Sequence, residues 1–330
     1  MNGVSIIICC YNAVKRIEPT LRHLQVQRFT KQINWEVIIV DNASTDNTSQ
    51  AAEQTWSRKQ VTDFRIVQEL KPGLMHARQT GMETAKYDIV SFIDDDNWVE
   101  PEWVQKVFNL FDINKKVGAC GGRNEVVFES TVPKWFDMFK ESFAVGQQAS
   151  ETGIIDKETG FLWGAGLSLR KSSWQSLQKK SYVNLTLDRQ GNILSSGGDT
   201  ELCYAFRLLG YELYYDNDLT LQHYMPPGRM NFSYLKKMYV GFGKANVRLN
   251  YYRVLLNPGI FKLHKWWYEF LVSVKNIIKY FMICKFSQKQ HSRWKAGVQN
   301  AYWRGYASQT WKDQDSAKIM IDRLKETFTK

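Results

Sequence analysis

Short apolar runs alternate with segments of helical periodicity over the first hundred residues, and this alternation most restricts the possible fold. Four apolar runs have the length of buried strands, at 4–10, 35–40, 64–67 and 89–93. Between them lie helical patterns near 17–27, after Ser44-Thr45-Asp46 and at 74–85. Strands alternating with helices indicate βαβ units. We therefore predict an α/β fold with a Rossmann-like, largely parallel sheet.

Polar residues follow three of these strands, where open parallel sheets bind their ligands. Tyr11 and Asn12 follow the first strand, Asp41 ends the second, and Asp94-Asp95-Asp96 ends the fourth. Three adjacent carboxylates repel one another, and a hard divalent cation such as Mg²⁺ or Mn²⁺ relieves that repulsion. The alternative is a solvated acidic turn that caps a helix beginning near Pro101.

Four segments occur in a fixed order, namely 9–12, 40–46, 73–78 and 94–96. In order and spacing they resemble the nucleotide-binding half of the inverting family-two glycosyltransferases of the GT-A fold, over roughly residues 4–225. That family has a YN pair, a DDxSxDxT-like stretch, a G-xxx-AR-N helix and a DxD motif. The chain differs at Asn42, where a second Asp is common, at Gln79, where Asn is common, and at Asn97, which follows the aspartates.

The resemblance implies a nucleotide-sugar site. Asp41 would accept the imide proton of uracil, Tyr11 and Asn12 would lie at the base, and Asp94 and Asp95 would bind the donor. Arg78 would support the phosphates or the sugar from a helix N-terminus. A surface salt bridge is the alternative for Arg78, and a helix-capping role is the alternative for Asp41.

The resemblance also implies a metal that bridges the donor diphosphate. Asp96 would bind Mg²⁺ or Mn²⁺, and His223 matches the histidine that often completes the metal shell. A purely structural histidine is the alternative, because an isolated histidine usually has no ligand role.

The segment 196–201 resembles the G-E-D-x-D/E-L sequence that carries the family's general base, which implies that Asp199 deprotonates the acceptor. Gly198 replaces the family's Glu, which leaves open whether Asp199 or Glu201 binds the acceptor hydroxyl. A helix N-cap is the alternative for Asp199. Trp163 and Gly164 match the glycine-rich acceptor loop, although a buried Trp beside a tight turn fits equally well.

Composition shifts at Pro226-Pro227-Gly228, which predicts a catalytic domain at 1–227 and a basic, aromatic-rich helical region at 228–330. The second region has 20 Lys/Arg and five Asp/Glu, a net charge of +15 within a chain total of +11. An apolar stripe at 270–282 predicts a helix that lies on anionic lipid or packs on the catalytic domain. The stripe is too short and too charged to span a membrane.

Several alternatives are weakened by the sequence. No G-x-G-x-x-G follows the first strand, which disfavours an NAD-type oxidoreductase. A nucleic-acid-binding protein would leave the strand-end aspartates without a role, and a non-catalytic sugar-binding protein would not need Asp199. The QxxRW match at 290–294 lies far from Asp199, so we treat it as coincidence.

The predicted function is metal-dependent, inverting transfer from a UDP-linked nucleotide sugar to a saccharide or lipid-linked acceptor in polysaccharide or glycoconjugate synthesis. Five scattered cysteines and the lack of a signal sequence favour a reducing compartment. We therefore expect a cytoplasmic enzyme, at most peripheral on the inner membrane face, without a nucleic-acid partner.

Overall fold

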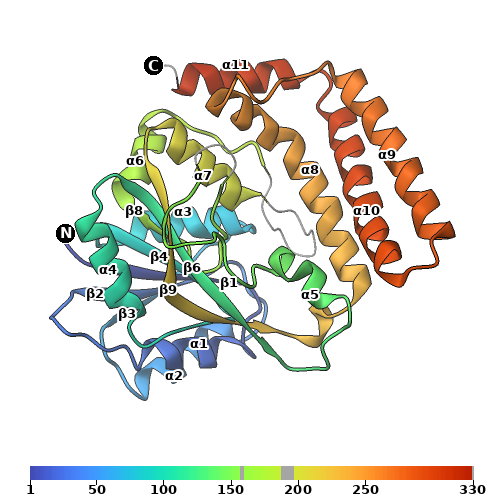
Figure 1. Ribbon diagram of the computed structural model, residues 1–330. Coiled ribbons are helices and arrows are strands. Elements are labelled where there is room, and N and C mark those ends of the chain that lie inside the picture. Colours follow the sequence, from blue (N-terminus) through green and yellow to red (C-terminus); the bar gives the residue numbers. More distant parts are fainter. Residues whose placement is uncertain (157–159, 187–196, 329–330) are drawn as a thin grey trace.

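The computed structural model describes residues 1–156, 160–186 and 197–328. A twisted sheet forms its centre, with helices on both faces, and the helices of the last third stand together beside it (Figure 1).

The sheet has the strand order β3-β2-β1-β4-β8-β6-β9-β5, and β7 pairs with β9 outside this path. The first four strands are parallel, as the sequence predicted. β8 is antiparallel to β4 and β6, whereas the long strands β6 and β9 are parallel to each other. The strands are β1 (Val4–Cys10), β2 (Trp35–Asp41), β3 (Asp63–Gln68), β4 (Ile89–Asp94), β5 (Asn97–Val99), β6 (Val117–Phe128), β7 (Gly153–Ile154), β8 (Ser168–Arg170) and β9 (Glu212–Met225).

Two helical layers cover the sheet because its buried strands are apolar on both faces. Successive residues of β1 alternate between two cores: Ile7 packs on one side, and Ile6 and Ile8 pack on the other. The core around Ile6 includes α1 (Ile17–Leu24), α2 (Thr48–Ser57) and α4 (Trp103–Ile113). The core around Ile7 includes α3 (Leu74–Thr84), α6 (Lys171–Lys179) and α7 (Gly198–Leu208).

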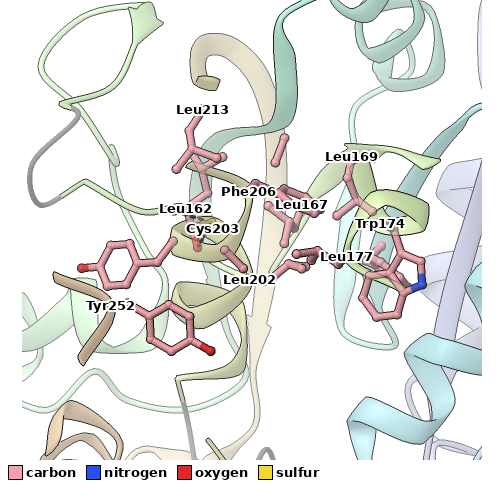
Figure 2. Close-up of a cluster of buried hydrophobic side chains, with 14 of the residues drawn as sticks. Leu162, Leu167, Leu169, Trp174, Leu177, Leu202, Cys203, Phe206, Leu213 and Tyr252 are labelled. Carbon is pink, nitrogen blue, oxygen red and sulfur yellow. Dashed lines mark hydrogen bonds between the residues drawn. The ribbon is translucent and has the colours of Figure 1, made fainter. Parts of the chain in front are cut away.

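The core around α7 also holds part of the C-terminal region. Figure 2 shows Leu202, Cys203 and Phe206 of α7 among buried leucines, with Tyr252 beside them. Tyr252 belongs to α8 (Phe232–Leu256), which follows the short helices α5 (Phe136–Phe139), η1 (Lys140–Phe143) and η2 (Pro227–Arg229) in the chain. Helix α8 therefore shares its hydrophobic core with the sheet domain.

The remaining helices are α9 (Trp266–Phe286), α10 (Gln290–Lys312) and α11 (Ala317–Phe328). Helix α10 lies between α8 and α9 (Figure 1). Two glycines let α8 and α10 approach closely, because a Cβ on Gly243 would lie 2.0 Å from the Tyr302 carbonyl oxygen and one on Gly305 would lie 2.1 Å from that of Val240. The helical C-terminal region agrees with the prediction.

The apolar stripe of α9 is divided between two environments. Phe270 packs on Trp311 of α10, with ring centroids 5.4 Å apart. Leu271, Ile278, Phe281 and Met282 are exposed instead, and Lys275 and Lys279 are exposed with them. Apolar and basic side chains therefore share the exposed face of α9, because the apolar residues extend around more of the helix than α10 covers. Among the helices described, none has the length and hydropathy needed to cross a membrane.

Candidate active site

A cavity of about 1340 Å³ opens at the carboxyl ends of β1 and β4. It brings together nine residues that the sequence predicted for the site: Tyr11, Arg78, Asp94, Asp95, Asp96, Trp163, Gly164, Asp199 and His223. Three others, Asn12, Asp41 and Glu201, are not among its lining residues. Ser196, the first residue of the predicted catalytic segment, falls outside the described residues.

Asn12 and Asp41 hold together the loops that follow β1 and β2. Asn12 has a φ of 50° and accepts a hydrogen bond of 2.8 Å from the Thr45 amide. Asp41 accepts a hydrogen bond of 3.1 Å from the Ser44 amide and a second hydrogen bond from the Ser49 hydroxyl. Burial raises the pKa of Asp41, but these bonds outweigh it and the pKa lies below its usual value. Both side chains therefore shape the cavity beneath the exposed ring of Tyr11.

Asn42, where the family commonly has a second Asp, positions the start of α3. Its side-chain oxygen accepts a hydrogen bond of 2.7 Å from the Gly73 amide. Its Nδ2 donates hydrogen bonds to the backbone carbonyls of Glu69 at 3.1 Å and Lys71 at 2.7 Å. A carboxylate could not donate these two bonds. The departure from the family pattern thus matches the local hydrogen bonding.

The three aspartates after β4 have different environments. Asp95 forms a two-point ion pair with Arg16, at 3.2 Å to Nε and 2.9 Å to Nη2. Burial, followed by the nearby charge of Asp96, raises the pKa of Asp95 above its usual value, and Arg16 opposes this shift. Asp94 ends β4, and its backbone amide donates a hydrogen bond of 3.2 Å to the side-chain oxygen of Asn97. Arginine pairing therefore relieves much of the repulsion that the sequence suggested.

Asp96 and His223 meet although they are far apart in the chain, because β5 and β9 pair Asn97 with His223. The His223 Nε2 atom lies 3.5 Å from Asp96 Oδ1. Arg229 completes the group, with Nη2 2.9 Å from Asp96 Oδ2. The neighbouring carboxylates raise the pKa of Arg229 despite its burial, which by itself lowers the pKa.

This group offers a carboxylate oxygen, which suits Mg²⁺ or Mn²⁺, and beside it an imidazole nitrogen, which is a ligand of transition metals. Among the described residues, no three His, Cys, Asp or Glu side chains are arranged to hold a metal ion. Asp96 and His223 would therefore make up only part of a metal shell.

Asp199 lies in the first turn of α7. The N-cap of this helix is Gly197, with a φ of 110° and no side-chain cap bond, so Asp199 is not the capping residue. Its side chain is 32% exposed and pairs with the buried Arg78 guanidinium, which packs over Phe92 at 5.4 Å. Arg78 is thus no surface salt bridge, and it fixes the orientation of the Asp199 carboxylate.

Gly164 lies directly against Asp199. A Cβ at this position would be 2.3 Å from Asp199 Oδ2, so only glycine leaves room for the carboxylate. The adjacent Trp163 is half-buried, lines the cavity, and donates its amide at 2.6 Å to Gln148. The glycine-rich loop therefore forms the part of the cavity wall next to Asp199.

Glu201 does not support the acceptor contact that we predicted for it. Its side chain is fully buried and accepts bonds from the amides of Leu185 at 2.5 Å and Thr186 at 2.7 Å, and from the Tyr252 hydroxyl at 2.5 Å. Residues two apart on a helix point about 200° apart, so Asp199 and Glu201 face opposite sides. Glu201 instead connects α7 to α8, through Tyr252, and to Leu185 and Thr186, which precede α7 in the chain.

Several cavity residues were missed from the sequence, above all Arg16, Arg229 and Arg253. Arg16 lies only five residues after Tyr11, and Arg229 follows the proline pair that we used as a domain boundary. The positive charge of these arginines could have indicated partners for the acidic run. We attributed the charge of the C-terminal region to contact with a membrane surface instead.

Residues 5–177 match the sequence profile of the family described as glycosyl transferase family 2, and this chain belongs to that family. It is therefore a glycosyltransferase, with the GT-A fold that the sequence predicted.

Relatives with assigned names match part of the chain. EpsH of Bacillus subtilis, named as a glycosyltransferase, is 31% identical over 129 residues, which are 39% of this chain and 36% of that protein. Poly-beta-1,6-N-acetyl-D-glucosamine synthase of Staphylococcus aureus is 29% identical over 133 residues, which are 40% of this chain and 31% of that protein. The match spans about a third of the length of these relatives.

Solved structures share the fold over most of the chain. The mannosyltransferase PcManGT of Pyrobaculum calidifontis, in complex with GDP-Man and Mn²⁺, aligns with a TM-score of 0.57 at 16% identity, covering 94% of this chain and 88% of that one. S. aureus TarS 1-349 in complex with UDP-GlcNAc aligns with a TM-score of 0.54 at 15% identity, covering 94% and 92%. At these identities the likeness establishes the fold alone.

Proposed function

We propose that this glycosyltransferase carries out metal-dependent, inverting sugar transfer from a nucleotide-sugar donor, UDP-linked by preference, to a saccharide or lipid-linked acceptor in polysaccharide or glycoconjugate synthesis. One observation carries the proposal: a single cavity has the acidic run 94–96 on one wall and Asp199 on another. Bound GDP-Man and UDP-GlcNAc in proteins of this fold support the donor class.

The donor half of the site extends from Tyr11 to the acidic run. We assign Tyr11 to the base and Asp94 and Asp95 to the nucleotide sugar. Asn12 and Asp41 act through the loops whose position they fix. Arg16 and Arg229 balance the negative charge of this wall before a donor arrives.

Asp96 and His223 would hold the Mg²⁺ or Mn²⁺ ion. When bound, such an ion neutralises charge on a nucleoside-diphosphate leaving group. Asp96 pairs with Arg229 at 2.9 Å. A bound donor and metal would therefore have to displace Arg229 from this carboxylate. The Mn²⁺ in the mannosyltransferase of the same fold supports a divalent metal.

Asp199 is the proposed general base. It would accept the proton of the acceptor hydroxyl while Arg78 orients its carboxylate and Gly164 keeps the approach open. Trp163 and Gly164 form the proposed acceptor wall beside it. One base and one leaving group imply a single displacement, and hence inversion at the anomeric carbon.

We also propose that the enzyme is peripheral on the inner, anionic face of a membrane. The exposed face of α9 combines Leu271, Ile278 and Phe281 with Lys275 and Lys279. Apolar side chains enter the lipid interface and lysines attract anionic head groups, so the two together favour a lipid surface. A second copy of the chain would not need this positive charge.

The substitution Asp199→Asn tests the base. It removes basicity but keeps size, so turnover should fall roughly 10²-fold or more while donor affinity persists. Transfer kinetics and UDP titration would measure the two effects, with the exposed Asp137→Asn of α5 as control. Unchanged turnover in Asp199→Asn, or a retained anomer by NMR, would contradict the assignment.

Chelation and Asp96→Ala test the metal. EDTA should abolish transfer and weaken UDP binding in the wild type, and Mn²⁺ should restore both. Asp96→Ala should weaken UDP binding only when Mn²⁺ is present, because the aspartate acts through the ion. Full transfer activity in EDTA would rule out metal dependence.

A further inference from the structure

The cavity continues beyond Asp199 along one face of α8. Seven residues of this helix line it: Tyr234, Met238, Phe242, Ala245, Asn246, Leu249 and Arg253. From Tyr234 to Arg253 the helix rises about 28 Å. The cavity volume of about 1340 Å³ exceeds the roughly 300–1,000 Å³ usual for one small ligand. The site therefore has room for a second substrate beside the donor.

The two ends of this helical face differ in their neighbours. Arg229, which pairs with Asp96 at 2.9 Å, lies shortly before Tyr234 in the chain, so the N-terminal end of the face lies near the Asp96 corner. Further along, a Cβ on Gly197 would meet Ala245 at 2.8 Å, so the middle of α8 adjoins the start of α7, which carries Asp199. Arg253 lies about two turns beyond Ala245. The C-terminal end of the face is therefore on the far side of the base from the donor wall.

Arg253 is held in place by neutral groups. Its Nη1 donates to the side-chain oxygens of Asn246 at 2.5 Å and Asn250 at 2.6 Å, and its Nε donates to the Tyr204 hydroxyl at 3.2 Å. The guanidinium also packs over the Tyr204 ring at 5.7 Å. These contacts orient the charge without neutralising it.

The positive charges of four other arginines in the cavity are balanced by carboxylates. Arg16, Arg78, Arg123 and Arg229 each pair with an Asp or Glu. For Arg253, no carboxylate lies within ion-pairing distance in the described portions 1–156, 160–186 and 197–328. A partly buried, pre-oriented guanidinium without a carboxylate partner is suited to an anionic ligand.

We infer that Arg253 binds an anionic group, a carboxylate or a phosphate, on the acceptor saccharide. Asn246 and Tyr302, which are hydrogen-bonded to each other on the same wall, contact its hydroxyl groups. This inference rests on the proposed function, because it places the acceptor beyond Asp199. It adds the chemical class of the acceptor and the helix that recognises it.

Calorimetric titration with small probes tests this subsite. Glucose, glucuronate and glucose 6-phosphate would each be added at low salt to the full chain saturated with UDP and Mn²⁺, which occupy the donor phosphate site. The wild type should bind one or both anionic probes about tenfold or more tightly than glucose. Comparing glucuronate with glucose 6-phosphate separates carboxylate from phosphate recognition.

Three variants assign the preference to Arg253. Arg253→Gln should bind all three probes alike. Asn246→Asp adds a carboxylate beside the guanidinium and should also remove the preference, even if Arg253→Gln fails to fold. Lys236→Gln, on the exposed side of the same helix, removes equal charge and should match the wild type.

The outcomes separate the two proposals. Failure of the wild type to bind UDP would contradict the proposed donor site. Normal UDP binding with equal affinity for neutral and anionic probes would overturn the acceptor inference alone. An anionic preference that survives in both Arg253→Gln and Asn246→Asp would overturn it as well.

Discussion

At the scale of single residues, Gly164 and Asp199 show how little space the proposed reaction centre leaves. The missing side chain of Gly164 is the volume that the Asp199 carboxylate occupies. Gly164→Ala should push this carboxylate away while the acidic run stays in place. A displacement of about 1 Å can cost roughly 10²-fold in rate, so turnover should fall by about that factor with UDP affinity retained.

Transfer kinetics and UDP titration on Gly164→Ala would measure this effect. Gly259→Ala is the matched control, since a Cβ there meets nothing within 4 Å. Equal turnover in the two variants would show that Asp199 tolerates the shift or is not the base.

The sequence located the residues of the site better than it located their partners. Asp96 and His223 were predicted as a pair, and the structure places them 3.5 Å apart. Arg16 was missed because it reaches Asp95 across 79 residues, and no local pattern records such a contact. Glu201 was misassigned because the sequence does not show which of two nearby acidic residues, Asp199 or Glu201, faces the cavity. That depends on how the helix is oriented about its axis.

At the scale of elements, the first four strands were predictable from the sequence and β6 was not. β1, β2 and β4 are mostly apolar runs, which is typical of strands buried on both faces, whereas the edge strand β3 is partly exposed and contains Arg65. β6 was missed because it contains Gly118, Gly121 and Gly122, which lower strand propensity. A Cβ on Gly122 would lie 1.8 Å from the Leu219 carbonyl oxygen, so this glycine serves the close pairing of β6 with β9.

The contact between α8 and α10 gives a prediction at this scale. Gly243→Ala would place a methyl group against the backbone of Tyr302, which no rotamer change can relieve. We expect a loss of about 1–3 kcal/mol in the free energy of unfolding, measured by denaturant titration.

Gly297→Ala is the matched control in α10, because its nearest neighbour is the end of the Phe232 ring at 3.3 Å. Both substitutions gain helix propensity, so the difference between them isolates the backbone contact. Equal stability of the two variants would mean that the helices separate without cost.

At the scale of the whole molecule, α9 carries the predicted membrane contact. Ile278 is 59% exposed on the outer side of the helical group, although the sequence allowed it to be core. Replacing Lys275, Lys279 and Lys285 with Gln should weaken binding to anionic vesicles by about 3 kcal/mol at low salt, at roughly 1 kcal/mol per lysine. High salt should weaken wild-type binding in the same way.

Flotation with vesicles of phosphatidylcholine, alone or with phosphatidylglycerol, would measure this. A triple variant at the exposed Lys59, Lys115 and Lys116 controls for net charge. Equal recovery with both vesicle types would rule out electrostatic docking. Dimerisation without vesicle binding in sedimentation would assign the face of α9 to a second copy instead.

Because α8 belongs to the core of the sheet domain and also lines the cavity, the two parts of the chain are not interchangeable modules. A fragment ending at Pro227 would keep the acidic run but lose one wall of the cavity and expose the apolar side of α7. Chimaeras that exchange the segment after residue 227 between family members would therefore exchange the α8 wall of the cavity and disturb the core around α7 at the same time. Evolution of a new acceptor preference in the C-terminal segment would thus require matching changes in the sheet domain.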